Sequence, residues 1–213
     1  MQNRYSKFAV LALALVALAP AALADVLWDQ STVDPAGPGI VASNSPGFNG
    51  FVAHSVNDVV VPAEGWHITR ITQYYGGFNY NWEFLSSGYV NVTPKGGSLP
   101  SGTPSNVAVP MSCANTGDVM GTALFSVVAN VSIDLVPGSY WIGLTPSGPA
   151  GLDGANLLWA SAMVGSPVAT YMAPGPWDAF YGNYDGAFKI EGYVNAPVPT
   201  GNTSWGRVKS LFR

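Results

Sequence analysis

The side chains able to act as acids, bases or nucleophiles are few and lie far apart in the sequence. The glutamates Glu64, Glu83 and Glu191 occupy three separate segments, whereas glycoside hydrolysis needs two carboxyl groups that face one substrate. The two histidines, His54 and His67, form no H-E-x-x-H zinc motif. No G-x-S-x-G segment presents a nucleophilic serine. This pattern predicts a protein that is not an enzyme.

Two segments rich in aspartate and asparagine have the composition of a calcium site without its spacing. "GLDGAN" contains Asp153 and Asn156, and "PWDAFYGNYDG" contains Asp178, Asn183 and Asp185. Neither matches the twelve-residue loop of an EF-hand. Asp-Gly and Asn-rich pieces are typical of turns. We therefore interpret both segments as turns and assign no metal ion and no cofactor to the chain.

Aromatic residues gather in two stretches, "QYYGGFNYNWEF" and "PWDAFYGNYDG". Flat ring faces beside amides and carboxylates suit sugar rings, which offer apolar faces and hydroxyl edges. Rings with a polar group also fill the ends of a β-sandwich, where strands turn. Both interpretations stay open at this point. Under the first, the candidate ligand-binding residues are Tyr74, Tyr75, Tyr80, Trp82, Trp177, Tyr181 and Tyr184.

The chain ends in a basic amphipathic segment, "TSWGRVKSLFR", which follows a spacer that contains Pro197 and Pro199. A short helix here would place the apolar residues on one side, but about ten residues are too few for a stable isolated helix. We expect it to order only on a partner, either sorting machinery or another envelope component, or an anionic membrane surface. The plainer alternative is a frayed end or a last strand on the body. The candidate attachment residues are Trp205, Arg207, Val208, Lys209, Leu211, Phe212 and Arg213.

The N-terminus has the three parts of a secretory signal peptide: Arg4 and Lys7, an apolar run over 8–18, and small residues before Asp25. The run is too short for a transmembrane helix, so none is expected after cleavage between Ala24 and Asp25. Cleavage removes two of the eight basic residues and none of the twelve acidic ones. The resulting acidic chain is a poor partner for nucleic acid. We expect an exported protein, extracellular or at the cell surface.

The elements that must position these residues read as short strands. Apolar runs are closed by Gly, Pro, Asn or Asp, and residues 131–135 and 187–194 alternate with the period of a half-buried strand. About ten such runs and no helical stretch predict an antiparallel β-sandwich, of jelly-roll or immunoglobulin-like type, over residues 25–195. Residues 1–24 form the signal peptide and 196–213 the Pro/Gly linker and basic tail. Cys113 is the only cysteine, so the fold has no internal disulfide.

Several strand and turn motifs resemble a family of secreted bacterial β-sandwich proteins that is itself uncharacterised. The chain matches its W-D-Q, V-P-x-G-x-W-x-I, G-x-Y-W-I-G and A-F-x-I-x-G signatures across about residues 26–194. The family often has two adjacent acids where this chain has Asn57 and Asp58, and Val59 replaces an aromatic residue, which argues against a cation site there. The tail resembles short C-terminal sorting segments of bacterial envelope proteins, of the form W-G-x-V-K-x-L-F-R.

These observations predict an exported, non-enzymatic β-sandwich with a structural or adhesive role in the bacterial envelope or exterior, attached or sorted by its C-terminal segment. The alternative is a carbohydrate-binding module that uses the clustered aromatic residues to hold a polysaccharide. The two hypotheses differ in where mutation disables the protein. The tail matters under the first, and exposed rings matter under the second.

Overall fold

The protein is known from a computed structural model that describes residues 24–41, 44–45, 51–78, 82, 85–147, 155–163, 168–179 and 184–195. Every regular element that these residues form is a β-strand, and none is a helix long and apolar enough to cross a membrane. The strands are β1 (Asp25–Asp29), β2 (Gly39–Val41), β3 (Asn44–Ser45), β4 (Phe51–Val61), β5 (Trp66–Phe78), β6 (Ser87–Pro94), β7 (Val107–Val119), β8 (Thr122–Leu135), β9 (Gly138–Ser147), β10 (Ala155–Trp159), β11 (Ala169–Met172), β12 (Trp177–Asp178) and β13 (Phe188–Val194).

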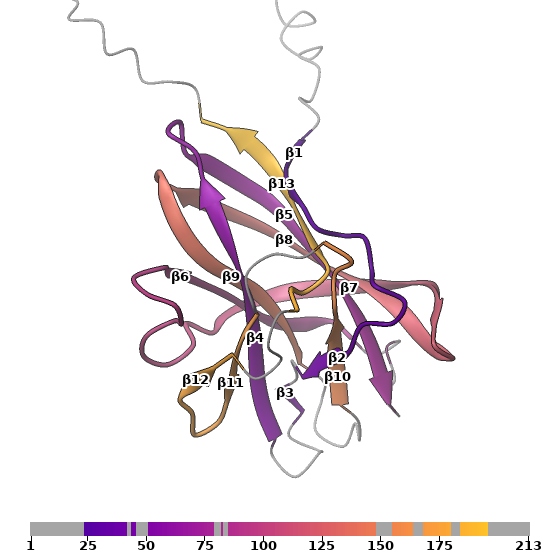
Figure 1. Cartoon of the computed structure of the whole chain (residues 1–213). Helices are drawn as coiled ribbons and strands as arrows, with labels where there is room; N and C mark the ends of the chain where they lie inside the picture. Colours follow the sequence, from indigo (N-terminus) through magenta and orange to yellow (C-terminus); the bar gives the residue numbers. More distant parts are fainter. Residues whose placement is uncertain are drawn as a thin grey trace, which may run out of the picture.

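The strands form two layers that face each other (Figure 1). In the first layer β1, β13, β5 and β8 lie side by side, and β10 pairs with the far end of β5 and with β2. In the second layer β6, β9 and β4 lie side by side, and the β11–β12 hairpin extends it beyond β4. All these pairings are antiparallel except a single parallel bridge between β3 and β9. The predicted all-β antiparallel fold is therefore confirmed.

Strand β7 connects the two layers into one curled sheet. Its first residues, 107–110, pair with β6 in the second layer. From Met111 to Val119 the same strand pairs with β8 in the first layer. The sequence predicted only the apolar start of this strand, because residues 112–118 are mostly small and polar and lack the alternation of a half-buried strand. Pairing with β8 extends the strand through them, with one shift of register between Asn115 and Gly117.

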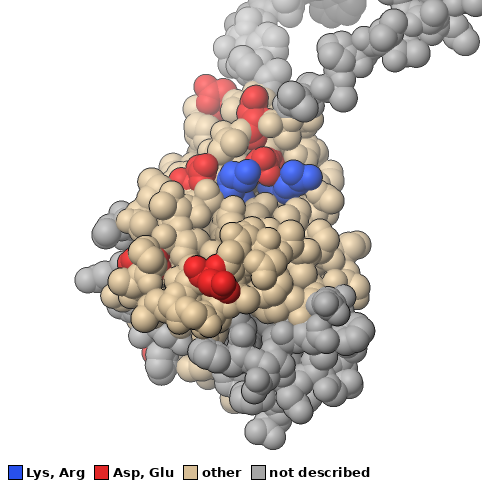
Figure 2. Space-filling view, turned by 90° about the vertical axis from the view of Figure 1, so that its right-hand side faces the viewer, with Lys and Arg blue, Asp and Glu red and all other residues tan. Residues whose placement is uncertain are grey.

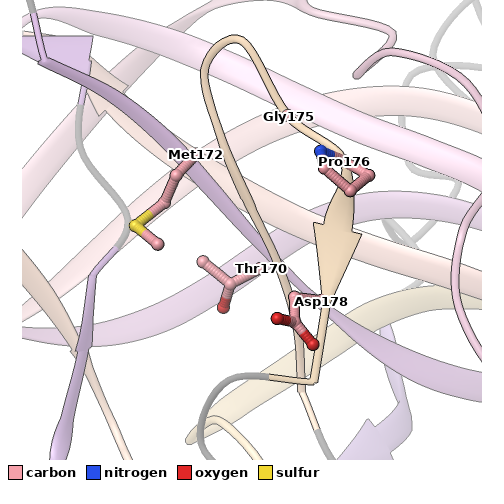
Figure 3. Close-up of a pocket in the computed structure, with 5 residues that line it drawn as sticks. All are labelled: Thr170, Met172, Gly175, Pro176 and Asp178. Carbon is pink, nitrogen blue, oxygen red and sulfur yellow. The ribbon is translucent and has the colours of Figure 1, made fainter.

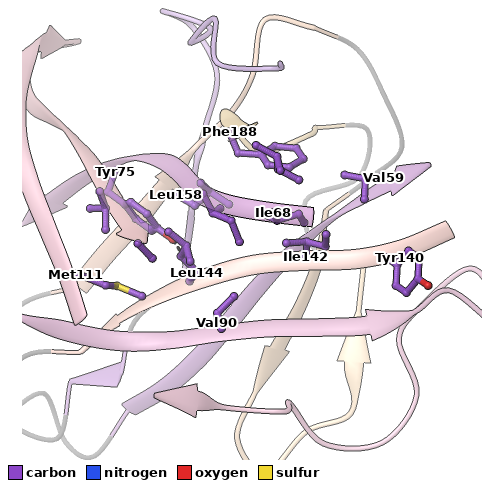
Figure 4. Close-up of a cluster of buried hydrophobic side chains, with 14 of the residues drawn as sticks. Val59, Ile68, Tyr75, Val90, Met111, Tyr140, Ile142, Leu144, Leu158 and Phe188 are labelled. Carbon is purple, nitrogen blue, oxygen red and sulfur yellow. Dashed lines mark hydrogen bonds between the residues drawn. The ribbon is translucent and has the colours of Figure 1, made fainter. Parts of the chain in front are cut away.

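The main core fills the space between the layers (Figure 4). Tyr140, Ile142 and Leu144 of β9 point into it, as their alternation predicted. Trp141, between them, points to the opposite face and belongs to a second, smaller apolar cluster with Val56, Ala169 and Trp177. Both faces of β9 are therefore buried.

The second cluster is covered by the connection between β6 and β7, residues 95–106. Leu99 packs against the cluster, and the backbone oxygen of Gly102 accepts a hydrogen bond from Trp177 Nε1 at 2.9 Å. At the start of the connection, Lys95 donates to the carboxylate of Asp58 and lies 4.8 Å from the centre of the Trp141 ring. A loop that the sequence indicated only as a Gly/Pro-rich turn thus shields the outer face of the second layer.

The predicted signal peptide, linker and tail, residues 1–23 and 196–213, lie outside the described residues. Ala24, the last residue of the predicted signal peptide, is exposed and directly precedes β1. The predicted cleavage site remains a prediction. Cys113 is a free thiol on β7 and donates to the backbone oxygen of Trp82 at 3.2 Å. Burial raises the pKa of this thiol, which keeps it protonated and disfavours thiolate chemistry.

Candidate functional site

A pocket of about 180 Å³ lies against the β11–β12 hairpin (Figure 3). Five residues of the hairpin line it: Thr170, Met172, Gly175, Pro176 and Asp178. Asp178 is exposed and supplies the only charged group among these five. The volume is below the roughly 300–1,000 Å³ of ordinary small-molecule sites. The pocket is small and open, and Thr170 and Asp178 supply its polar side chains.

Trp177 belongs to the same hairpin but turns away from the pocket. Strand alternation sends its ring to the face opposite Asp178, where it packs 5.4 Å from the Tyr171 ring. It is 6% exposed. Trp177 was predicted to bind a ligand. Its ring has no free face for a sugar, because the second cluster and the loop at Gly102 cover it.

Tyr75 and Trp82, two more predicted ligand-binding residues, are also buried. Figure 4 shows Tyr75 among the core side chains. The Trp82 ring stacks on Phe125 at 4.8 Å and lies 6.1 Å from Tyr75. The Tyr75 hydroxyl lies 2.7 Å from the backbone oxygen of Leu144 and 2.9 Å from Gln73 Oε1. These contacts favour the core interpretation for both rings. The sequence favoured that interpretation for the rings as a group, but it did not say which rings are buried, because burial depends on β8 and β9, which come later in the chain.

The other predicted ring residues do not form one surface in the described part of the chain. Tyr74 is half-buried on β5, and Tyr184, 42% exposed, lies in the segment before β13. Tyr80 and Tyr181 lie outside the described residues. The structure therefore brings together Tyr75 and Trp82 in the core, and it places Trp177, Tyr74 and Tyr184 on separate elements.

A buried polar cluster on β4 was not predicted from the sequence. His54 is 1% exposed, and its Nδ1 lies 2.9 Å from Thr145 Oγ1 and 3.4 Å from the amide nitrogen of Asn91. Burial lowers the pKa of His54 to about 4, so the imidazole is neutral at pH 7. A hydroxyl beside an imidazole is the arrangement of a nucleophile and its base. Thr145 is fully buried, however, and no substrate reaches it in this conformation.

Asn91 connects this cluster to the β6–β7 connection, because its amide nitrogen contacts His54 and its side-chain oxygen contacts Asn106. Its side-chain oxygen accepts from the backbone nitrogen of Asn106 at 2.9 Å, which fixes the end of the 95–106 connection over the strand. It is 1% exposed, so the sequon that begins at Asn91 is inaccessible in the folded protein. The sequence signal for the cluster was the polar residues at alternate positions in "YVNVT", which are also typical of an exposed strand face.

A second buried polar cluster surrounds Asp185, just before β13. The Asp185 carboxylate accepts from Gln30 Nε2 at 2.9 Å and from the backbone nitrogen of Gly186 at 3.2 Å. The same Gly186 nitrogen donates to Asn57 Oδ1 at 2.7 Å. Asp185 is 1% exposed. The sequence indicated a surface turn here, and the structure instead places this carboxylate inside the protein.

Charged residues of the first layer pair on its outer face (Figure 2). Lys189 lies 3.1 Å and Arg70 3.8 Å from the Glu191 carboxylate. His67 contacts Asp134 at 2.7 Å and stacks on Tyr193. The two lone histidines thus have different environments, since His67 belongs to this exposed face and His54 is buried. Arg70 and Lys189 are thus both engaged by one acid, and the body keeps its excess of acidic over basic residues.

No group of three or more His, Cys, Asp or Glu side chains gathers into a possible metal site within the described ranges. The Asp58 carboxylate is paired with Lys95, and the side-chain oxygen of its neighbour Asn57 accepts a hydrogen bond from the Gly186 nitrogen. Comparison with protein families, curated proteins and solved structures gives no match for this chain. The function must therefore be argued from the geometry.

Proposed function

We propose that this protein is an exported, non-enzymatic β-sandwich with a structural or adhesive role in the bacterial envelope or exterior, held or sorted by its C-terminal segment. The observation that carries the proposal is the position of the two ends of the described body. Asp25, at the start of β1, pairs with Gly192 of β13. The first and last described residues, Ala24 and Asn195, therefore lie toward the same pole of the sandwich (Figure 1).

This arrangement suits attachment at one pole. A C-terminal segment that follows Asn195 would hold the body by this pole, and removal of a signal peptide before Asp25 would not disturb the core. The β11–β12 hairpin, whose residues line the pocket, lies toward the opposite pole (Figure 1). An attached molecule would present that pole outward. Buried rings and buried polar clusters support a role in which the body supplies a stable shape.

The test compares cells that express the full chain with cells that express a chain ending at Asn195. Under the proposal the full chain stays with the cell envelope, and the shortened chain is released into the medium. A matched variant, with Arg207, Lys209 and Arg213 replaced by glutamine, keeps the length of the tail and tests its charge. Equal distribution of the full and shortened chains between cells and medium would refute the role of the tail.

Carbohydrate binding remains the second candidate, and the pocket beside Asp178 is the observation in its favour. A carboxylate in a shallow pocket near the outward pole suits sugar hydroxyls. The burial of Tyr75, Trp82 and Trp177 weighs against it, because those rings cannot stack on a ligand. Retention of the protein on insoluble polysaccharides, lost in Asp178→Ala and kept in the exposed control Asp118→Ala, would favour this candidate.

A further inference from the structure

The curled sheet has an open side, where its first and last strands approach each other without forming a ladder along their length. On one side lie β1, β2 and β10, and on the other lie β4 and β11. Strands β2 and β4 are in contact across this gap. We call this closure, made by residues 184–187 and their hydrogen-bond partners, the seam.

Backbone hydrogen bonds of residues 184–187 reach both sides of the seam. The Ser161 nitrogen, just after β10, donates to the Asp185 oxygen at 2.7 Å, and the Ala187 nitrogen donates to the Trp159 oxygen at 2.8 Å. On the other side, the Val168 nitrogen, just before β11, donates to the Tyr184 oxygen at 2.9 Å. Four consecutive residues therefore join two edges between which the described residues form no strand pairing.

Side chains complete the closure around Asp185. Gln30, at the end of β1, donates to its carboxylate, and Asn57 of β4 accepts from the Gly186 nitrogen. A Cβ atom at Gly186 would lie 2.7 Å from Asn57 Oδ1, so this approach requires glycine. The Ser161 hydroxyl donates to the Gln30 backbone oxygen at 2.8 Å. Asp185 is thus a buried acid at the meeting point of β1, β4 and β10.

We propose that Asp185 is a proton-dependent latch of the seam, which closes the open side of the sheet while its carboxyl group is protonated and loosens it when the proton is released to solvent. The reason is hydration. A buried carboxylate recovers water only if the seam opens, whereas a protonated carboxyl group needs much less hydration. The main core is apolar, so release of the Asp185 proton does not favour its exposure to water.

The electrostatic surroundings agree with this geometry. Burial raises the pKa of the Asp185 carboxyl to about 7, the hydrogen bond from Gln30 opposes the rise, and the nearby Asp58 carboxylate adds to it. The Gly186 nitrogen also opposes the rise, as does Lys95 from the β6–β7 connection, which is itself paired with Asp58. Among the described residues Asp58 and Lys95 are the charged groups that act on Asp185, and β1 and β10 contribute only neutral ones, Gln30 and Ser161.

The sign follows from proton linkage. The closed seam binds the Asp185 proton more tightly than the open seam, in which the pKa returns toward 3.8. Closure is therefore strongest below about pH 4 and weakens as the pH rises toward about 7, where the effect levels off. Within this window the equilibrium constant for opening rises up to about tenfold per pH unit.

Amide hydrogen exchange of the purified chain, measured by NMR from pH 5 to pH 8 and corrected for intrinsic rates, tests the latch. The reporters are the amides of Ser161, Val168 and Ala187, and the reference is the β5–β8 ladder. Seam protection is expected to fall about tenfold per unit up to about pH 7 relative to the reference. In Asp185→Asn it should not change with pH, and the exposed control Asp118→Asn should behave as wild type.

Two outcomes would overturn the latch: seam protection that does not change with pH in the wild-type chain, or the same change in Asp185→Asn. If Asp185→Asn fails to fold, Asp58→Asn replaces it. Removal of the Asp58 charge should lower the pH at which seam protection levels off, and an unchanged profile would contradict the proposal. The experiment is independent of the tail and of cell attachment.

Discussion

At the scale of single residues, Tyr75 connects the two layers through one hydroxyl group. It projects from β5, and its proton is shared between the Leu144 backbone oxygen of β9 and Gln73 Oε1. Gln73 Oε1 also accepts from the Leu144 nitrogen at 2.6 Å. Burial raises the pKa of Tyr75, so the phenol remains a donor. This short network fixes how β5 and β9 lie across the core.

Replacement of Tyr75 by phenylalanine removes the hydroxyl and keeps the ring. The buried acceptors then lose their donor, so we expect the free energy of unfolding to fall by about 1–2 kcal/mol. Urea unfolding followed by tryptophan fluorescence measures the change. Tyr140→Phe is the matched control, because its hydroxyl donates to Val136 in a partly buried turn. An equal or larger loss in Tyr140→Phe would argue against the cross-layer role of Tyr75.

The burial of His54 should make the stability of the protein depend on pH in the opposite direction to Asp185. The pKa of His54 falls from 6.5 to about 4 on burial, so the unfolded chain binds a proton that the folded chain does not. The contribution is fully present above about pH 6.5 and is lost as the pH falls toward 4, at about 1.4 kcal/mol per unit. The stability advantage of wild type over His54→Gln, measured by urea unfolding, should shrink from pH 7 to pH 4.5. A constant difference would contradict the burial of a neutral imidazole.

At the scale of elements, β4 and β9 approach closely beside Gly143. An added Cβ atom at this position would overlap the backbone oxygen of Ser55 on β4. The backbone cannot yield easily, because both faces of β9 are packed, with Ile142 in the main core and Trp141 in the second cluster. The close contact of the two strands thus depends on the absence of a side chain.

We expect Gly143→Ala to lower the free energy of unfolding by about 1–3 kcal/mol, the usual range for overpacking of a core. Gly96→Ala is the matched control, because a Cβ atom added at Gly96 would meet nothing within 4 Å and a surface change of this kind costs less than about 0.5 kcal/mol. Thermal or urea unfolding compares the two. Equal stability of the two variants would show that β4 and β9 can separate without cost.

At the scale of the whole molecule, one strand and one seam make the two layers a single closed body. Strand β7 joins the layers on one side through backbone pairing, and Asp185 and its neighbours join them on the other through short polar contacts. The strand ladder on the first side is continuous, whereas the seam depends on a few hydrogen bonds around an ionisable group. The seam is therefore where the molecule should open first, and His54 and Asp185 act on stability in opposite directions between about pH 4 and 6.5.

The sequence by itself determined the all-β class and, where apolar and polar residues alternate, which side of a strand faces inward. In residues 188–191, Phe188 and Ile190 are buried while Lys189 and Glu191 pair on the outer face, as the alternation predicted. In β9 the alternation likewise separates Tyr140, Ile142 and Leu144 from Trp141, but the structure buries both faces. The reason is local, since successive side chains of a strand point to opposite faces whatever the rest of the fold does. The all-β fold class and the antiparallel pairing of the strands follow from these alternating patterns and from the short turns between them.

Only the tertiary structure decided which polar and aromatic side chains are buried. Gln30 and Asp185 are 155 positions apart and meet inside the protein, and Trp177 loses its free face to a loop that ends about 70 positions earlier in the chain. Alternation along a strand says which side a residue faces but not what covers that side. Coverage depends on how distant segments close over one another, so the buried clusters, the pocket and the seam became visible only in the folded chain.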